Sequence, residues 1–124
     1  MMKTMTRTRL MCGVAFALLT SMGTVHADSV ILVTTINRTL VVGDEMFGGC
    51  MAALGVDPST LLPGCARNWV TFSCTGDFAE QVQAYRMLDQ AQLALATDKT
   101  VMLQVRDSQK HNGYCYAARI DVIR

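Results

Sequence analysis

Residues 69–106, WVTFSCTGDFAEQVQAYRMLDQAQLALATDKTVMLQVR, decide the fold class, because strand-like and helix-like patterns follow one another directly there. Over residues 69–74, Trp69, Thr71 and Ser73 alternate with Val70, Phe72 and Cys74, a period-two pattern that predicts a strand. Residues 78–96 contain no Gly or Pro and are rich in Ala, Leu, Gln and Met, a composition typical of a helix. Asp77, with Glu80 three residues later, predicts a capping box at the start of that helix.

Four more strand patterns lie on either side of this segment. They cover residues 30–42, 46–54, 100–106 and 114–123. Residues 30–42 form one long bent strand or two strands broken at Asn37-Arg38, and Gly48-Gly49 marks a bulge or sharp bend in the next. Five strands with one long helix between the third and the fourth predict an α+β, mainly β fold, an OB-fold-like barrel. In that barrel the third strand pairs with the fifth, which also meets the first; other α+β arrangements fit the same order.

The first 27 residues have the pattern of a removable export signal. A basic region, residues 1–9, precedes the apolar residues 10–22, and Val25 and Ala27 occupy the −3 and −1 positions of a cleavage site. A membrane anchor is the competing interpretation, but a span needs roughly 20 apolar residues. We therefore expect a signal peptide over residues 1–27, one domain over residues 28–124, and a periplasmic or secreted product without a membrane span.

The net charge argues against a nucleic-acid partner. The 124 residues include 11 basic and 10 acidic side chains, for a net charge of +1. Lys3, Arg7 and Arg9 lie in the expected signal and no acidic residue does, which leaves 8 basic against 10 acidic residues and a net charge of −2. A nucleic-acid-binding surface needs a basic stripe to meet the phosphates, and this balance does not favour one.

Four cysteines remain after the expected cleavage: Cys50, Cys65, Cys74 and Cys115. An even number in a short exported chain predicts two disulfide bonds, for which three pairings are possible. The expected strand order favours Cys50–Cys65 and Cys74–Cys115, because the third and fifth strands pair in the barrel. A metal site is the alternative, but only His111 is left to help and no C-x-x-C occurs, so we expect no metal.

The expected helix is apolar on two sides. The first stripe contains Ala84, Leu88, Ala91 and Leu95, at spacings of four, three and four residues. The second stripe, roughly 140° away around the helix, contains Phe78, Val82, Tyr85, Leu93 and Ala96. A helix that packs on a barrel needs only one such stripe. The second one therefore contacts another protomer or lies under another part of the same chain.

A polar segment before the last strand is the candidate ligand-binding site. Residues 107–113 have the composition of a loop that ends in a strong turn signal, Asn112-Gly113, and OB-folds use the corresponding loop for oligosaccharides. The residues assigned to ligand binding are Asp107, Lys110, His111 and Asn112. A solvated hairpin tip is the alternative. The aromatic candidates for stacking on a sugar ring are Trp69, Tyr114 and Tyr116.

The sequence offers little for catalysis or for a cofactor. His111 is the one histidine after the expected signal, no G-x-S-x-G occurs, and bonded cysteines provide no thiolate nucleophile. Gly48-Gly49 is not followed by a helix and therefore does not resemble a phosphate-binding loop. We expect neither an enzyme nor a bound cofactor.

Several features between Cys50 and Arg106 match a known family. They are the Cys50 and Cys65 pair, Trp69 shortly after it, LDQAQ over residues 88–92 and TDKTV over residues 97–101. This stretch resembles the B subunits of bacterial A-B toxins of the subtilase-cytotoxin and typhoid-toxin type, and it is also similar to small exported OB-like proteins of unassigned role. The resemblance implies a pentamer-forming, glycan-binding OB domain with helices around a central pore. For the serine that holds a sialylated sugar in that family, the nearby polar candidates are Ser29, Thr34 and Thr35.

Two functions from different classes fit these observations. The first is an exported non-catalytic binding module, a toxin B-subunit-like homo-oligomer that recognises a glycan or a protein surface. The alternative is a monomeric periplasmic accessory or inhibitor protein that acts on a protein partner. The oligomeric state separates the two, because only the first needs a second protomer.

Overall fold

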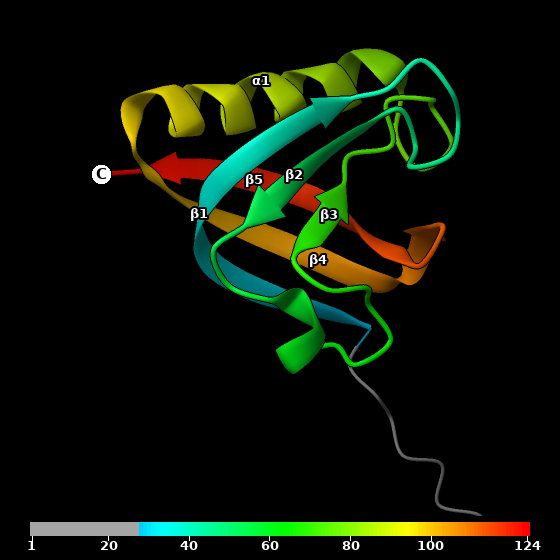
Figure 1. The fold of residues 1–124 in the computed structure, drawn as a ribbon, viewed down its shortest axis with the longest axis horizontal. Coiled ribbons are helices and arrows are strands. Elements are labelled where there is room, and N and C mark those ends of the chain that lie inside the picture. The colour runs from blue at the N-terminus through cyan, green and yellow to red at the C-terminus, as the bar shows by residue number, and fades with distance from the viewer. Residues whose placement is uncertain (1–27) are drawn as a thin grey trace, which may run out of the picture.

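A computed structural model describes residues 28–124, and the expected signal peptide of residues 1–27 lies outside the described residues. The described chain is mainly β, with five strands in one sheet and one α-helix between the third and the fourth strand (Figure 1), as the sequence predicts. The elements are β1 (Ser29–Val41), β2 (Cys50–Leu54), a 3₁₀ turn (Pro58–Thr60), β3 (Trp69–Thr71), α1 (Gln81–Thr97), β4 (Thr100–His111) and β5 (Tyr114–Ile123). No helix within residues 28–124 is long and apolar enough to cross a membrane.

The strands pair in the order β1-β2-β3-β5-β4, and β4 also pairs with β1, so the sheet closes on itself. β1 pairs with two strands: residues 29–35 pair with β4, and residues 36–41 pair with β2. The register shifts between Ile36 and Arg38, so the predicted break is a bend within one long strand. The expectation that the fifth strand meets the first is wrong. β4 is long enough to pair with both and lies between them.

The second and third strands are shorter than the sequence predicts. β2 begins only at Cys50, because Gly48 and Gly49 adopt positive φ angles of 73° and 81° and turn the chain before it. β3 ends at Thr71, because Ser73 has a φ of 59°, outside the range of an extended strand. The Ser73 conformation directs the chain away from the sheet toward α1.

The polar segment between the last two strands is mostly strand, so the predicted loop over residues 107–113 is wrong. β4 continues to His111, and the turn consists of Asn112 and Gly113, with φ angles of 51° and 84°. Two consecutive residues with positive φ form the turn whose twist suits a β-hairpin. Cross-strand pairing extends to the turn, where His111 lies opposite Tyr114.

The predicted capping box does not form at the start of α1. Glu80 precedes the helix and makes no side-chain hydrogen bond there. Asp77 lies in the preceding turn, where its carboxylate accepts a hydrogen bond from the Thr75 hydroxyl at 2.8 Å. At the other end, Asp98 adopts a left-handed conformation with a φ of 52° and stops the helix.

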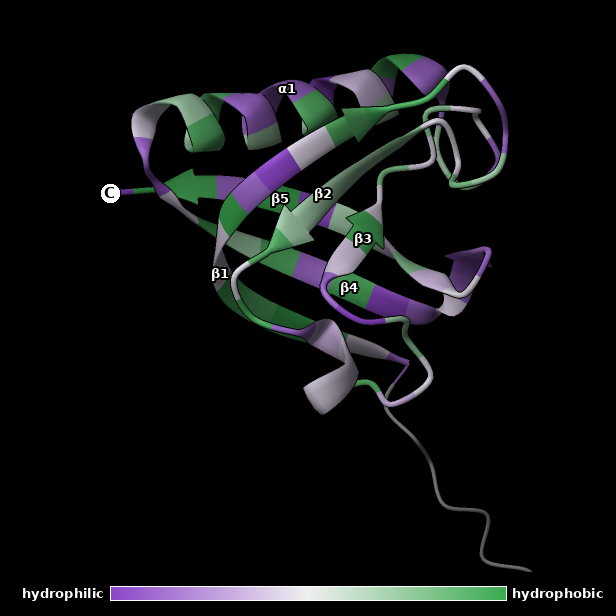
Figure 2. Ribbon diagram, viewed as in Figure 1, coloured by the Kyte–Doolittle hydropathy of each residue, from purple (hydrophilic) through white to green (hydrophobic). Residues whose placement is uncertain are grey.

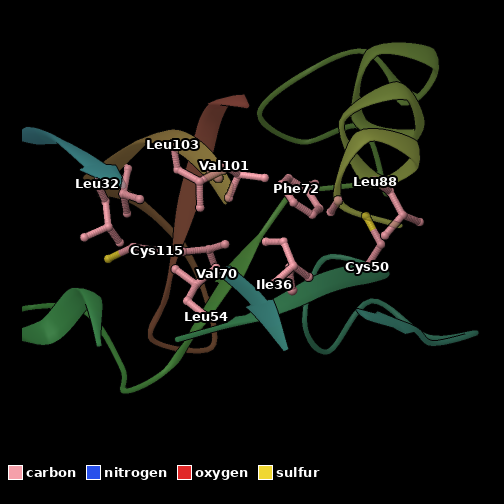
Figure 3. Close-up of a cluster of buried hydrophobic side chains, with 14 of the residues drawn as sticks. Leu32, Ile36, Cys50, Leu54, Val70, Phe72, Leu88, Val101, Leu103 and Cys115 are labelled. Carbon is pink, nitrogen blue, oxygen red and sulfur yellow. The ribbon is translucent and has the colours of Figure 1, made fainter. Parts of the chain in front are cut away.

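The hydrophobic core fills the closed sheet and extends to the inner side of α1 (Figure 3). Hydrophobic residues recur along the strands and the helix (Figure 2). Strand residues in the core include Leu32, Ile36, Val70, Val101, Leu103 and Val105. α1 buries Ala84, Leu88 and Ala91 against them, as the first stripe predicts. Leu95 is 40% exposed, however, and Ala94 takes the buried position in its place.

Two disulfide bonds join the four cysteines, but the expected pairing is wrong. Cys50 bonds Cys74 and Cys65 bonds Cys115, with Cα–Cα distances of 5.6 and 5.3 Å. Disulfides form and persist in oxidising compartments. The two bonds therefore fit a periplasmic or extracellular location.

The strand register explains this pairing. β2 and β3 are antiparallel with Met51 opposite Thr71, so the start of β2 lies beside the chain that leaves β3. The loop before β3 instead reaches the β4–β5 turn, where the Ala66 N–H donates to the Gly113 carbonyl at 2.8 Å. Cys65 lies in the loop before β3 and Cys74 in the chain after it, and sequence order alone does not reveal that they lie over different ends of the sheet.

Removal of either disulfide should lower the free energy of unfolding by about 2–4 kcal/mol. We expect Cys65→Ala/Cys115→Ala to lose about 0.6 kcal/mol more than Cys50→Ala/Cys74→Ala, because the bonds span 50 and 24 residues and the longer loop gains more unfolded-state entropy. Urea unfolding of both double variants beside the wild type measures the losses. Stability equal to the wild type in both would contradict the pairing.

Candidate functional site

The four predicted ligand-binding residues lie at the β4–β5 hairpin, but they do not form one surface cluster. The Lys110 ammonium group donates to the Gly64 carbonyl at 2.8 Å and ties the loop before β3 to the hairpin. Asn112 is exposed in the turn, and the backbone N–H of Asp107 donates to the Asp28 carbonyl at 3.0 Å. The His111 side chain is only 13% exposed and points away from the hairpin tip into a polar cluster. Their role in ligand binding stays a prediction.

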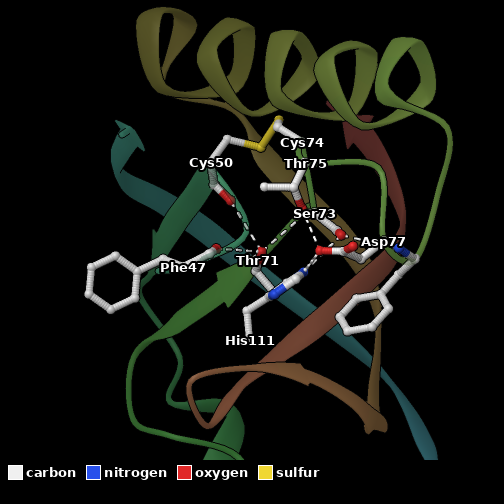
Figure 4. The surroundings of a disulfide bond; sticks show 9 residues. Phe47, Cys50, Thr71, Ser73, Cys74, Thr75, Asp77 and His111 are labelled. Atoms are coloured by element: carbon white, nitrogen blue, oxygen red, sulfur yellow. Dashed lines mark hydrogen bonds and ion pairs between the residues drawn. A yellow bond between two sulfur atoms is a disulfide. The ribbon is translucent and has the colours of Figure 1, made fainter. Parts of the chain in front are cut away.

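The polar cluster joins the end of the hairpin to the turn before α1 (Figure 4). Nε2 of His111 lies 2.9 Å from the Ser73 hydroxyl and 3.6 Å from a carboxylate oxygen of Asp77. The Ser73 hydroxyl also accepts a hydrogen bond from the Phe78 N–H at 3.2 Å. The Phe78 ring lies over the imidazole, with 4.5 Å between ring centroids. The cluster thus connects β3, β4 and the chain that enters α1.

A serine, a histidine and an aspartate meet in this cluster, but not with the geometry of a catalytic triad. In a triad the serine bonds one ring nitrogen and the carboxylate bonds the other, which orients the imidazole. Here Ser73 and Asp77 both approach Nε2 of His111. Ser73 is also completely buried, so a substrate cannot reach its hydroxyl. The hydrogen bonds of this cluster therefore hold the segment between β3 and α1 against the end of β4.

Glycine at position 48 makes room for the His111 ring. A Cβ atom on Gly48 would lie 2.5 Å from Cδ2 of His111 and 2.6 Å from the Thr71 hydroxyl. That hydroxyl donates to the Phe47 carbonyl at 2.8 Å and accepts from the Ser73 N–H at 3.0 Å. The turn before β2 is therefore hydrogen-bonded to Thr71 of β3 and lies close to the His111 ring at Gly48.

A second candidate site lies on the outer face of β1, β2 and β3. Arg38 pairs with Ala53, and Ala53 pairs with Trp69, so these three residues form one row across the strands. Alternate strand residues point to opposite faces, and the next residues along β2 and β3, Ala52 and Val70, point into the core. The Arg38 guanidinium carbon lies 5.8 Å from the centroid of the Trp69 ring. We call these three residues the Arg38–Trp69 row.

The loop before β3 fixes the position of Trp69. The Asp57 carboxylate accepts hydrogen bonds from the Ser59 N–H at 2.9 Å and from the Asn68 N–H at 3.3 Å. Asn68 adopts a left-handed φ of 65°, and its carbonyl accepts from the Leu54 N–H at 2.7 Å. The hydrogen bonds from Ser59, followed by that from Asn68, lower the pKa of Asp57 below 3.8.

The other two aromatic candidates are packed against neighbouring side chains. Tyr116 is 5% exposed, and burial raises the pKa of its phenol. Tyr114 packs edge-on against Phe47, with 5.5 Å between ring centroids. Trp69 is half-buried and lies beside the exposed side chain of Arg38.

The polar candidates from the toxin resemblance lie along the first half of β1. Thr34 is buried, and its hydroxyl accepts a hydrogen bond from the Val56 N–H at 2.9 Å. The Thr35 hydroxyl is exposed and donates to the Asn37 side chain at 3.1 Å. Ser29 pairs with Arg106 at the opposite end of the β1–β4 ladder. The three hydroxyl groups therefore have different surroundings and do not converge on one point.

Comparison with known proteins adds no assignment, since no family model, curated protein or solved structure matches this chain. Among residues 28–124, no group of three or more His, Cys, Asp or Glu side chains is placed to hold a metal ion. The same residues enclose no detectable pocket. The Arg38–Trp69 row therefore lies on the surface of the sheet and not in a pocket.

Ser73→Ala should lower the free energy of unfolding by about 1–3 kcal/mol, because it leaves the Phe78 N–H and the His111 ring without their shared partner. Chemical denaturation measures the loss. Ser108→Ala is the control, since Ser108 is an exposed serine on β4, the strand of His111, and lies outside the cluster; it should change stability by no more than about 0.5 kcal/mol. Equal effects of the two changes would contradict the structural role of the cluster.

Asp57→Asn should destabilise the protein above the ordinary aspartate pKa of 3.8 but not in acid. Because the folded-state pKa of Asp57 is lowered, its carboxylate stabilises the fold above pH 3.8, and this contribution is lost as the pH falls through the lowered pKa. Thermal unfolding of variant and wild type over a pH series measures the difference in Tm. A difference that stays constant into strong acid would show that the charge of Asp57 does not matter.

Proposed function

We propose that this protein is an exported, non-catalytic binding module built on an OB-fold barrel, and that it recognises carbohydrate through the Arg38–Trp69 row. The closed sheet, its strand order and the helix between β3 and β4 support the OB-fold assignment. The two disulfide bonds support export to an oxidising compartment.

The Arg38–Trp69 row is the observation that carries this proposal. OB-folds bind oligosaccharides on the face formed by their second and third strands, and Ala53 and Trp69 lie on β2 and β3. An indole ring offers an apolar surface to the C–H groups of a sugar ring, while a guanidinium group offers five N–H donors to hydroxyl or carboxylate oxygens. The small Ala53 side chain lies between them in the row, so no bulky side chain of β2 separates the guanidinium group from the indole ring.

The chemistry of the row suits a neutral or acidic glycan. Arg38 is exposed, and no acidic side chain of residues 28–124 forms an ion pair with it, so its charge is available to a ligand. A nucleic acid fits the surface less well, because the chain after the expected signal has a net charge of −2. The resemblance to toxin B subunits supports the same ligand class.

A protein partner is the second candidate function. Three large apolar side chains on α1, Val82, Tyr85 and Leu93, are 47–62% exposed. An accessory or inhibitor protein would use such a face against its target, because exposed apolar patches mark interaction sites. A strict monomer that binds no glycan would favour this function.

Trp69→Ala should weaken glycan binding by at least about tenfold, because the stacking surface is lost. A glycan array identifies the ligand, and titration calorimetry with that sugar measures the affinity. Arg38→Ala, an exposed change, tests the same row if Trp69→Ala does not fold, and it too should weaken binding.

Lys110→Ala is the matched control, because it removes a cationic side chain from the other candidate site. Unchanged affinity in this variant, together with losses at Arg38 and Trp69, supports the row. Loss in Lys110→Ala alone would move the site to the hairpin. A folded wild-type protein that binds no glycan on the array would overturn carbohydrate recognition.

A further inference from the structure

α1 exposes large apolar side chains on the side that faces away from the sheet, and no part of residues 28–124 covers them. Val82 is 62% exposed and Leu93 is 49% exposed, although both are large hydrophobic residues on a regular helix. They point away from Ala84, Leu88 and Ala91, which are buried against the sheet. A surface helix needs only one apolar side to pack on its own domain. The outward apolar side chains therefore indicate a surface that another molecule contacts.

Four residues form the centre line of this outward face: Val82, Arg86, Asp89 and Leu93. Their spacings of four, three and four residues place them within about 60° of arc on one side of the helix. All four are exposed. The order along the line is apolar, positive, negative, apolar, and it is symmetric in position about the midpoint between residues 87 and 88. We call this set the α1 outer line.

The symmetric order makes the α1 outer line complementary to a second copy of itself. If two α1 helices pack antiparallel about a twofold axis at this midpoint, Val82 lies opposite the partner's Leu93. Arg86 then lies opposite the partner's Asp89, and both contacts occur twice because an isologous interface repeats each contact. Antiparallel packing also places the positive end of each helix dipole beside the negative end of the other.

We propose that α1 forms the interface of a homodimer, in which two copies pack their outer lines antiparallel with Arg86 paired to the partner's Asp89. Neither Arg86 nor Asp89 forms an ion pair within residues 28–124, so both charges are available to the partner. Any unrelated protein would have to supply the same charge order by chance, whereas a second copy supplies it by symmetry. Tyr85, 47% exposed, flanks the contact and adds aromatic area.

The length of α1 limits how large the contact can be. α1 has 17 residues and is therefore about 25 Å long, and one pair of such helices falls at the small end of specific interfaces, which begin near about 1,200 Å². We therefore expect a reversible dimer whose population rises with protein concentration. Dimerisation through α1 does not depend on what the Arg38–Trp69 row binds.

Charge reversal at the two central positions tests both the interface and its register. Arg86→Glu places two carboxylates opposite each other, and Asp89→Arg places two guanidinium groups opposite each other, so each variant alone should dimerise at least about tenfold more weakly. Mixing the two variants should restore dimers, because the Arg86→Glu chain then presents two carboxylates to the two guanidinium groups of the Asp89→Arg chain, and both cross-pairs become attractive. Arg124→Glu, the same charge change at the exposed chain end, is the control and should leave dimerisation unchanged.

Sedimentation velocity over a concentration series measures the dimer in protein exported with its own leader, and native mass spectrometry identifies the mixed dimer. Circular dichroism confirms that each variant remains folded. Dimers in the wild type, weaker dimers in each single variant and recovery in the mixture support the pairing. A monomer at every concentration, an assembly of five, or a mixture that recovers nothing overturns it; glycan binding, measured separately, is unaffected by that outcome.

Discussion

The sheet closes across its shortest strand, and the rest of the structure depends on how that closure is held. β3 has three residues and meets β5 at one pair, Thr71 with Tyr116. Backbone hydrogen bonds at one pair give little stability on their own. Both disulfide bonds lie around this junction, since one joins β2 to the chain leaving β3 and the other joins the loop before β3 to β5. The Ser73–His111 hydrogen bond adds a third link, between the chain leaving β3 and the end of β4.

This junction also positions the two surfaces for which we propose functions. Trp69 begins β3, so whatever holds β3 in place also holds the indole ring beside Arg38. The chain leaves β3 through the left-handed Ser73 and enters α1 after the turn that contains Asp77. These contacts place the start of α1, and the burial of Ala84, Leu88 and Ala91 against the core turns Val82 and Leu93 outward.

The candidate site shows why polar composition is an incomplete guide to a binding surface. The hairpin residues are predicted to bind a ligand because they are polar and precede a turn. In the structure the register shifts between Arg106 and Lys110, and the His111 side chain is only 13% exposed. Lys110 is used to hold a neighbouring loop. In the sequence Arg38 marks only a possible strand break. Its approach to Trp69 depends on pairing through Ala53, and a single sequence carries no signal for register across three strands.

The sequence by itself determined the order of elements, the strand over residues 114–123, the helix body and the buried stripe of Ala84, Leu88 and Ala91, because periodicity and composition are local properties. It also predicted two disulfide bonds from an even cysteine count. The tertiary structure alone decided which cysteines bond, which strands are neighbours and which polar groups are buried. Those outcomes depend on contacts between residues far apart in the chain, where the strand register and the left-handed turns at Gly48 and Ser73 bring side chains together.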